Sequence, residues 1–298
     1  MSGTILVLIT AVLWSTGGVS IKFVQASPAL IAVMRSLVAG LVLLPLIRPR
    51  SIRLSWAAVG LILSYALTMG TFVTATKWTT AANAIALQYS APLWLFAAGL
   101  VLRTVKPSVR RSAPMLLVLA GITLFLQEPA RGTSFKGNIM ALVSAVGFAL
   151  TTVFLRLLRR EHGLTLVSLC NLASALLIAP LVRDWGQLGA LGASGWTCLV
   201  YLGACQIALA YILYAKALTR VRPLKAATIV LIEPVLNPLW VFILIGEKPS
   251  VYAIAGAVVM LTGVALDIRL NPEIGPQQAH RAPPAESLSG SKGESSNE

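Results

Sequence analysis

A single carboxylate, Glu233, lies near the middle of an apolar segment, residues 226–245, that contains no other charged residue. Asn237 follows one helical turn later and shares its helix face. Pro234 and Pro238 each lack a backbone donor and interrupt helical hydrogen bonds, which frees carbonyl groups. An ionisable group at the bilayer centre costs about 2.5 to 3.5 kcal/mol and should face protein or a watery cavity. This combination favours the handling of a polar solute or a proton inside a membrane.

A second segment carries a similar pattern, because Pro92 is preceded by Gln88, Tyr89 and Ser90 and followed by Trp94. We predict that both segments are broken helices. The predicted hinge or gate residues are Pro92, Glu233, Pro234 and Pro238. For Glu233 we favour a protonated acid that donates to the freed carbonyls over a carrier of a coupling proton. A further alternative is that the prolines only bend the helices for packing.

Aromatic residues near the middle of the apolar segments favour a pocket that stacks an aromatic group, and amide side chains could bind its polar ends. The predicted substrate-binding residues are Trp14, Phe72, Gln88, Tyr89, Trp94, Phe148, Gln206, Tyr211, Asn237 and Trp240. Asn171 is a further amide at this depth. Taken singly, each aromatic residue is explained better by packing or lipid contact, so the pocket depends on their combination with two broken helices.

Two other charged residues lie close to the membrane. Arg35 is one or two turns into an apolar segment, and the simpler interpretation is that its side chain extends to the outer interface. The alternative is that Arg35 pairs with a carboxylate of the substrate or of the protein. Glu247 stands beside Lys248 and Pro249, and we expect an interface residue or a gate contact.

Residue types for catalysis and metal binding are scarce. Cys170, Cys198 and Cys205 lie in apolar segments at spacings that predict neither a disulfide framework nor a metal site. His162 and His280 fall in a basic loop and in the tail, so no His-centred triad or zinc motif is present. The sequence also lacks Walker and GxGxxG loops. We predict no enzyme activity, no cofactor and no metal.

The composition explains why these residues must be placed by membrane helices. The chain of 298 residues is 57% hydrophobic and 11% charged, and its mean hydropathy is +0.81. Segments long enough to cross a bilayer run over residues 3–22, 29–47, 56–76, 82–102, 113–127, 137–155, 164–182, 195–215, 224–246 and 250–268. The first segment has no basic residue before it, which favours a span over a cleaved signal peptide. We predict an all-α integral membrane protein with ten transmembrane helices.

Basic residues set the expected orientation. The connections after spans 2, 4, 6 and 8 hold fourteen of them: Arg48, Arg50, Arg53, Arg103, Lys106, Arg110, Arg111, Arg156, Arg159, Arg160, Lys216, Arg220, Arg222 and Lys225. The alternate connections hold six: Lys22, Lys77, Arg131, Lys136, Arg183 and Lys248. The positive-inside rule then places both termini in the cytoplasm. Because topology explains most of the net charge of +14, and no continuous basic face is present, we predict no nucleic-acid partner.

An internal repeat divides the spans into five plus five. An offset of 142 residues aligns "APLW" with "EPVL" and "LAGITL" with "LTGVAL", and an offset of 134 aligns "GTILVLITAVLW" with "GNIMALVSAVGF". Five spans are an odd number, so the second unit is inverted in the membrane, as in many secondary transporters. We expect one repeat at 1–134, a second at 135–270, and a disordered cytoplasmic tail at 271–298 that is rich in Pro, Gln, Ser, Gly and Glu.

The spans also resemble the drug/metabolite transporter superfamily, in particular its EamA-type ten-helix bacterial exporters. The resemblance covers residues 3–268 and rests on "AVLWSTGG", "VMRSLVAG", the Pro92 and Glu233–Pro234 positions, and "LIGEKPSVYAIAGAVVMLTGVAL". One departure is Val105, which stands where the second repeat has Glu247. Within the superfamily the chain looks most similar to aromatic amino-acid exporters.

The resemblance implies a secondary transporter that moves small metabolites through a central cavity lined by both repeats. We expect export of amino acids, especially aromatic or other bulky neutral ones, across a bacterial inner membrane by alternating access. The alternative within transport is an exporter of cationic drugs or other metabolites, for which Glu233 could pair with positive charge. An intramembrane enzyme or a lipid-handling protein would need a catalytic pair or a long soluble domain. The expected partners are the solute and membrane lipid, with a monomer as the functional unit.

Overall fold

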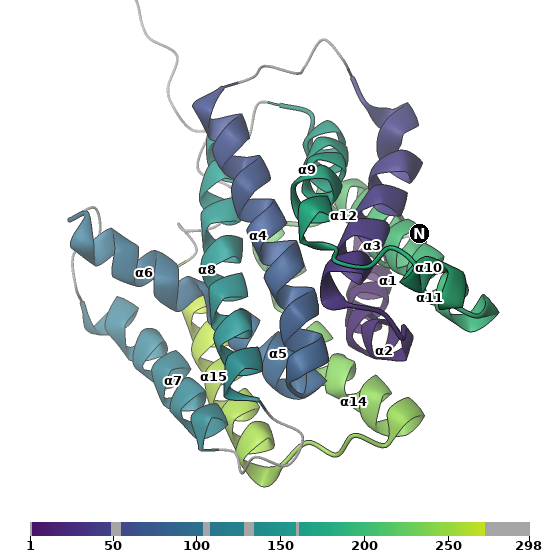
Figure 1. Cartoon of the computed structure of the whole chain (residues 1–298). Helices are drawn as coiled ribbons and strands as arrows, with labels where there is room; N and C mark the ends of the chain where they lie inside the picture. Colours follow the sequence, from purple (N-terminus) through teal and green to yellow (C-terminus); the bar gives the residue numbers. More distant parts are fainter. Residues whose placement is uncertain (1, 49–54, 104–107, 128–133, 159–160, 272–298) are drawn as a thin grey trace, which may run out of the picture.

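The computed structural model describes residues 2–48, 55–103, 108–127, 134–158 and 161–271, and the regular elements in these ranges are helices (Figure 1). Nine helical segments are long and apolar enough to cross a membrane: Gly3–Phe23, Pro28–Leu46, Trp56–Trp78, Ala81–Val101, Phe135–Leu157, Gly163–Leu181, Ala193–Leu218, Leu224–Ile245 and Val251–Leu270. They match nine of the ten predicted spans closely. The prediction of an all-α membrane protein is confirmed, whereas the predicted tail lies outside the described residues from position 272 onward.

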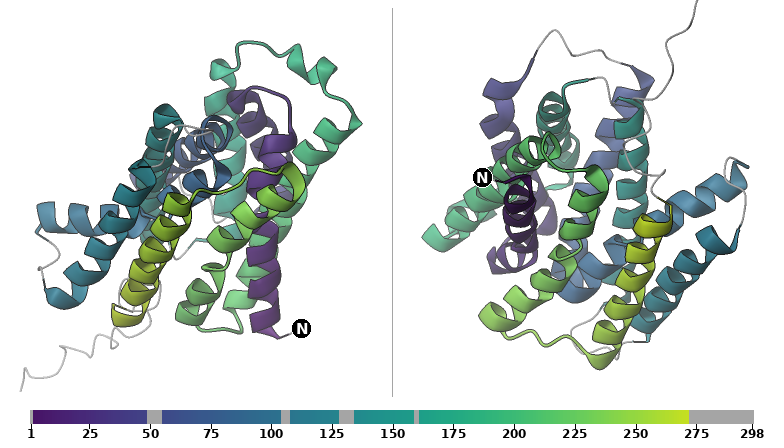
Figure 2. Two further views of the ribbon diagram at one scale, coloured as in Figure 1. Left: turned by 90° about the horizontal axis from the view of Figure 1, so that it is seen from below. Right: turned by 180° about the vertical axis from the view of Figure 1, so that it is seen from behind.

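The remaining predicted span, residues 113–127, corresponds to helix α7 (Val109–Leu126), which has Arg110 and Arg111 in its first turn and is not among those nine segments. α7 packs along α15 (Val251–Leu270), and Figures 1 and 2 show the two helices side by side. Glycines allow this approach, because a Cβ at Gly121 would come within 2.7 Å of the carbonyl oxygen of Gly256. Small residues at such a contact are typical of helices packed in a membrane.

Most spans start at a capped N-terminus, where a side chain accepts a hydrogen bond from the first helical turn. The capping residues are Ser2, Ser27, Ser55, Thr80, Ser134, His162 and Ser250. The uninterrupted spans are α4 (Trp56–Trp78), α8 (Phe135–Leu157) and α15. Two spans end in a short 3₁₀ turn: α3 (Pro28–Leu43) with η1 (Leu44–Leu46), and α9 (Gly163–Ile178) with η3 (Ala179–Leu181).

Spans 4 and 9 are broken at equivalent positions, as predicted. α5 (Ala81–Gln88) and α6 (Ala91–Val101) are separated at Tyr89–Ser90, and α13 (Pro223–Val230) and α14 (Glu233–Ile245) are separated at Leu231–Ile232. The two breaks are related by the offset of 142 residues found in the sequence. In each case a proline is the second residue of the following helix, where its missing N–H costs no helical hydrogen bond.

Two further irregularities were not predicted. Span 1 is divided at Thr16 into α1 (Gly3–Ser15) and α2 (Gly17–Phe23). Span 8 consists of α11 (Ala193–Tyr201), a π-helical stretch η4 (Leu202–Leu209) and α12 (Ala210–Leu218), and a short helix α10 (Gln187–Ala190) precedes it. Neither site contains proline, which is the residue that marked the other breaks.

The helix contacts repeat when the two halves are exchanged. α3 packs on α9 and α7 packs on α15, and each of these pairs joins equivalent spans. The contact of α4 with α8 has its counterpart in that of α12 with α1. Exchanging the halves therefore maps these contacts onto one another, which is the arrangement expected of inverted repeats.

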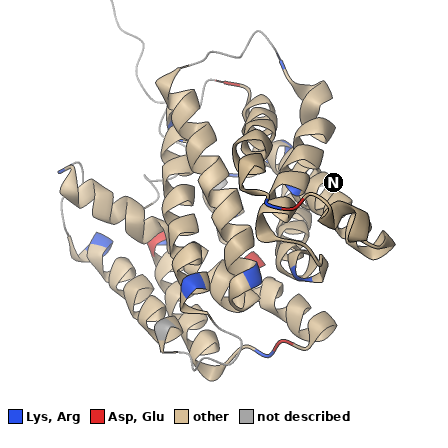
Figure 3. Ribbon diagram, viewed as in Figure 1, with Lys and Arg blue, Asp and Glu red and all other residues tan. Residues whose placement is uncertain are grey.

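The exterior of the bundle is apolar. Large hydrophobic side chains such as Val101, Leu176, Val251 and Val258 are exposed on the helices, as expected for a surface in lipid. Charged residues are sparse along the ribbons (Figure 3). The main apolar core lies between the spans and contains Phe72, Ile85, Phe125 and Met260.

Candidate functional site

The break in span 1 is held by polar side chains from the second half. At the end of α1, the Ser15 hydroxyl accepts a 2.9 Å hydrogen bond from Trp240 Nε1 on α14. The Thr16 hydroxyl lies 2.8 Å from the Tyr201 hydroxyl at the end of α11. The Trp14 carbonyl accepts from Gln206 Nε2 at 3.3 Å. Backbone groups and side chains at the break are therefore bonded to spans 8 and 9.

Arg35 lies next to this break in the interior of the protein. It is the eighth residue of α3 and its exposed fraction is 2%. One terminal nitrogen, Nη2, donates a 2.8 Å hydrogen bond to Gln206 Oε1. The simpler expectation, that Arg35 extends to the outer interface, is wrong. Close packing of α3 against η4 encloses the side chain, since a Cβ at Gly203 would lie 2.7 Å from the Arg35 carbonyl oxygen.

A group of aromatic side chains lies at about the same depth in the bundle as Arg35. The rings of Trp14 and Tyr211 are 5.5 Å apart at 64°, and those of Trp14 and Tyr214 are 5.2 Å apart at 52°. The Tyr211 hydroxyl interacts with that of Tyr65 on α4, and Asn171 Nδ2 donates to Tyr65 at 3.0 Å. Edge-to-face and tilted ring arrangements, such as those of Trp14 with the two tyrosines, are favourable for aromatic pairs.

Tyr89 joins Glu233 across the two halves. Its hydroxyl, at the break in span 4, donates a 2.9 Å hydrogen bond to Glu233 Oε2 at the break in span 9. Glu233 is also near enough to Tyr211 to influence it electrostatically, so the carboxylate lies in the neighbourhood of the aromatic group. We expected Glu233 to donate to carbonyls freed by Pro234 or Pro238, but the structure gives it the Tyr89 hydroxyl as a partner.

We call the residues linked in this way the central cluster. Its members come from spans 1, 2, 3, 4, 8 and 9, and all but Tyr214 lie near the middle of those spans: Trp14, Arg35, Tyr65, Tyr89, Gln206, Tyr211, Tyr214 and Glu233. Trp14, Tyr89, Gln206, Tyr211 and Glu233 were predicted from the sequence as site or hinge residues. Tyr65 and Tyr214 were missed, although Tyr65 is a mid-span tyrosine like Tyr211 and Tyr214 follows Tyr211 by about one turn.

Asn237 and Trp240 lie beside the central cluster, against α2. Asn237 is 1% exposed and packs on Gly18, where any Cβ would meet its amide oxygen. That oxygen has no hydrogen-bond partner among the described residues. The Trp240 ring packs with Val19, Ala81 and Val241.

The other predicted substrate-binding residues are placed elsewhere. Gln88 Nε2 donates to Ser144 Oγ at 2.7 Å and so fastens α5 to α8. Phe72 belongs to the main apolar core. Trp94 and Phe148 are 36% and 47% exposed, and the Trp94 indole bonds to Ser90 on its own segment. Among the hinge residues, Pro92 and Pro234 start the second half-helices, while Pro238 lies within α14.

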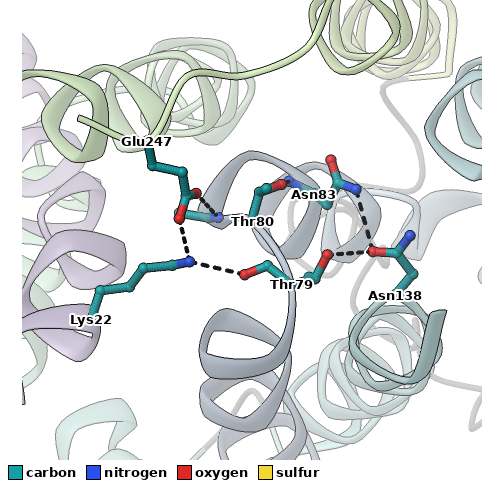
Figure 4. Close-up of polar contacts among 7 residues, drawn as sticks. Lys22, Thr79, Thr80, Asn83, Asn138 and Glu247 are labelled. Atoms are coloured by element: carbon teal, nitrogen blue, oxygen red, sulfur yellow. Dashed lines mark hydrogen bonds and ion pairs between the residues drawn. The ribbon is translucent and has the colours of Figure 1, made fainter. Parts of the chain in front are cut away.

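A second polar group links helices at one end of the bundle (Figure 4). Lys22 at the end of α2 forms an ion pair with Glu247 and also donates to the Thr79 carbonyl at 3.0 Å. The other oxygen of Glu247 accepts from the backbone N–H of Ala81 at 2.7 Å, at the positive end of α5. Gly246, with φ of 78°, ends α14 in a left-handed turn that directly precedes Glu247.

The same end is linked further to span 6. The Thr79 hydroxyl donates to Asn138 Oδ1 at 2.8 Å, and Asn83 Nδ2 donates to the same oxygen at 3.3 Å. Lys77 Nζ donates to the Val24 carbonyl at 2.8 Å. These bonds connect spans 1, 3, 4, 6 and 9 at the end that the sequence predicts to face outward.

The chemical groups of the central cluster limit what the site can do. Among residues 2–48, 55–103, 108–127, 134–158 and 161–271, no three His, Cys, Asp or Glu side chains are grouped so that they could hold a metal ion. The central cluster offers aromatic faces, hydroxyl and amide groups, one guanidinium and one carboxylate. Such a set can bind a small molecule that is partly apolar and partly charged.

Comparison with known proteins identifies relatives along nearly the whole chain. Residues 1–127 and 135–268 each match the EamA-like transporter family. An "Uncharacterized transporter" of Archaeoglobus fulgidus is 26% identical over 89% of this chain and 95% of its own length. "Uncharacterized transporter YwfM" of Bacillus subtilis is 28% identical, with 88% and 92% covered. "Uncharacterized inner membrane transporter YicL" of Salmonella typhimurium is 24% identical, with 89% and 94% covered.

A solved structure described as "Crystal structure of protein" has the same fold. It superposes with a TM-score of 0.61 and covers 91% of this chain and 98% of that chain, at 22% sequence identity. The boundary between the two family matches falls between span 5 and span 6, so each match covers one half of the helices. The contacts between equivalent spans join these two halves.

Proposed function

Because the chain belongs to the EamA-like transporter family, we propose that this multi-pass membrane transporter exports amino acids with bulky, chiefly aromatic, side chains. Export would proceed across a bacterial inner membrane by alternating access of the two halves. The observation that carries the proposal is the central cluster, in which Trp14 packs with Tyr211 and Tyr214 and which also contains Glu233 and Arg35. Aromatic faces beside charges of both signs suit a zwitterion with an aromatic side chain.

The position of the cluster also supports transport. Its polar groups lie in mid-span, next to the breaks in spans 1, 4 and 9, where backbone that is not helical must face protein or a cavity. In transporters built from inverted repeats, solute sites lie near the membrane midplane at broken helices. The ion pair of Lys22 with Glu247 lies at one end of the bundle, where it could close one side of the pathway.

Transport in proteoliposomes tests this proposal directly. Vesicles containing the purified protein and preloaded with unlabelled substrate would be given labelled phenylalanine, labelled alanine or labelled tetraphenylphosphonium in parallel. We expect counterflow of phenylalanine well above that of alanine and above protein-free vesicles. Uptake of alanine equal to that of phenylalanine would contradict the preference for bulky side chains.

A second candidate is export of cationic compounds. It is favoured by Glu233, a carboxylate that interacts with Tyr89 and Tyr211 and could pair with a positive charge. Accumulation of tetraphenylphosphonium without phenylalanine counterflow would support this candidate and exclude amino acids as the main substrates.

A further inference from the structure

Arg35 has unused hydrogen-bonding capacity in the interior of the protein. A guanidinium has five N–H donors and carries its charge at all physiological pH values. Nη2 of Arg35 donates to Gln206, whereas Nε and Nη1 have no hydrogen-bond partner among the described residues. The side chain is 2% exposed, so lipid headgroups and bulk water do not supply these partners. The geometry leaves two of the three guanidinium nitrogens, Nε and Nη1, without an acceptor among the described residues.

The charge of Arg35 is also not balanced by a neighbouring carboxylate in the described part of the chain. Its interactions are with the Gln206 amide and with the hydroxyl groups of Tyr65 and Tyr211. Glu233 accepts a hydrogen bond from Tyr89, and Tyr211 is near enough to both Arg35 and Glu233 to be influenced by their charges. A buried cation that lacks a partner anion is costly, and binding of an anion removes that cost.

The guanidinium is held in a fixed place. Gln206, which accepts from Nη2, also donates to the Trp14 carbonyl at the break in span 1. Gln206 belongs to the π-helical stretch η4, and Gly203 in the same stretch lets α3 approach closely. π-Helical segments are often found at functional sites. Arg35 is therefore anchored at one nitrogen by a side chain that also binds the Trp14 carbonyl, while Nε and Nη1 have no acceptor among the described residues.

We infer that Arg35 is the anion-binding group of the central cluster and binds the carboxylate of the substrate at the end of the guanidinium where Nη1 has no acceptor. Guanidinium and carboxylate groups form paired, charge-assisted hydrogen bonds of matching geometry. The inference rests on the proposed function for the nature of the solute and adds which end of it is bound. The competing role for Arg35 is structural, as a tie between α3 and η4 through Gln206.

Four related probes separate the carboxylate from the rest of an aromatic amino acid. Phenylalanine has both charged groups, 3-phenylpropanoate has only the carboxylate, phenethylamine has only the amine, and phenylalaninamide has an amide in place of the carboxylate. Binding to the purified full-length protein would be measured by thermal stabilisation and by calorimetric titration. We expect phenylalanine and 3-phenylpropanoate to bind at least about tenfold more tightly than their analogues without a carboxylate.

Variants then locate the anion site. Arg35→Gln should weaken binding of both carboxylate probes by about tenfold or more and should remove the discrimination between phenylalanine and phenylalaninamide. Arg35→Lys should keep part of the affinity, because the charge stays while the paired geometry is lost. Arg183→Gln, which removes an exposed arginine outside the cluster, is the matched control and should bind like the wild type.

The outcomes distinguish this inference from the proposed function. Tight binding of 3-phenylpropanoate that depends on Arg35, without phenylalanine counterflow, would keep the anion site and overturn amino acids as the substrates. Equal binding of phenylalanine and phenylalaninamide by the wild type would overturn the anion site even if no Arg35 variant folds. Failure of both carboxylate probes to bind would overturn it as well, as would wild-type affinity for them in Arg35→Gln.

Discussion

At the residue scale, Glu233 is bonded across the interface between the halves. Its carboxylate accepts a 2.9 Å hydrogen bond from the Tyr89 hydroxyl, and the two residues lie at the equivalent breaks of spans 9 and 4. An amide oxygen could accept the same hydrogen bond. A glutamine at position 233 would therefore keep the hydrogen bond from Tyr89 and remove the negative charge, so the two contributions can be measured separately.

We predict that Glu233→Gln keeps most counterflow, because the Tyr89 hydroxyl still finds an acceptor. Glu233→Leu should lose transport and lower the free energy of unfolding by about 1 kcal/mol, since the hydroxyl is left without its partner. Counterflow and thermal unfolding of both variants check this. If Glu233 carries a coupling proton instead, Glu233→Gln would abolish export driven by a pH gradient while exchange continues.

Two of the three tryptophans predicted as site residues, Trp14 and Trp94, now differ in the effect expected of their substitution. Trp14 contacts two tyrosine rings of the central cluster, whereas Trp94 is 36% exposed and bonds to Ser90 on its own segment. We predict that Trp14→Ala reduces phenylalanine counterflow severalfold more than alanine counterflow, because the larger substrate loses an aromatic neighbour. Trp94→Ala is the matched control, with similar small losses for both substrates. Equal effects of Trp14→Ala on both substrates would make its ring part of the scaffold.

At the element scale, the sequence predicted the helices and two of their breaks. Pro92 and Pro234 marked the interruptions of spans 4 and 9 because proline cannot continue the helical bonding of the preceding turn. The break at Thr16 has only Gly17 and Gly18 as a signal, and glycine is tolerated inside membrane helices. The π-helical stretch at 202–209 leaves the apolar pattern intact, so hydropathy did not reveal it.

The site was less predictable than the helices for a physical reason. Hydropathy places a residue along a span but does not say which neighbour its side chain meets. Arg35 was therefore expected to extend to the interface, and Phe72 to line the pocket, whereas the structure places Arg35 against Gln206 and Phe72 in the apolar core. Packing between segments far apart in the sequence decides both cases.

The ion pair between Lys22 and Glu247, which links helices at the end of the bundle shown in Figure 4, gives a prediction about stability. The side chains of Lys22 and Glu247 are 15% and 22% exposed, so their ion pair is partly shielded from water. We predict that Lys22→Met and Glu247→Gln are coupled by about 1 kcal/mol in a double-mutant cycle of thermal unfolding. Lys248→Met, at an exposed neighbouring lysine, should show no coupling to Glu247→Gln. Additive effects of the first pair would mean that the ion pair does not hold this end closed.

At the scale of the whole molecule, exchange of the two halves maps their helix contacts onto each other, but the central cluster is not symmetric. Spans 1 and 6 are equivalent, yet span 1 is broken at Thr16 while α8 is continuous. Arg35 and Glu233 likewise have no charged counterparts, since the residue equivalent to Glu233 in the first half is Ala91. A symmetric frame with one charge of each sign gives the cluster a direction, which would let it orient the zwitterionic solute that we propose.

The orientation of that frame in the membrane is predicted by the basic residues. The loops at 48–53 and 156–160, which lie partly outside the described residues, should both face the cytoplasm together with the termini. Gly163 and Gly189 offer a matched pair for labelling, because both are exposed and a Cβ at either meets no atom within 4 Å. In a background without the native cysteines, a reagent that cannot cross the membrane should label Gly189→Cys in intact cells but Gly163→Cys only after permeabilisation. The reverse pattern would invert the topology and place the Lys22–Glu247 contact on the cytoplasmic side, so that its opening would admit the solute instead of releasing it.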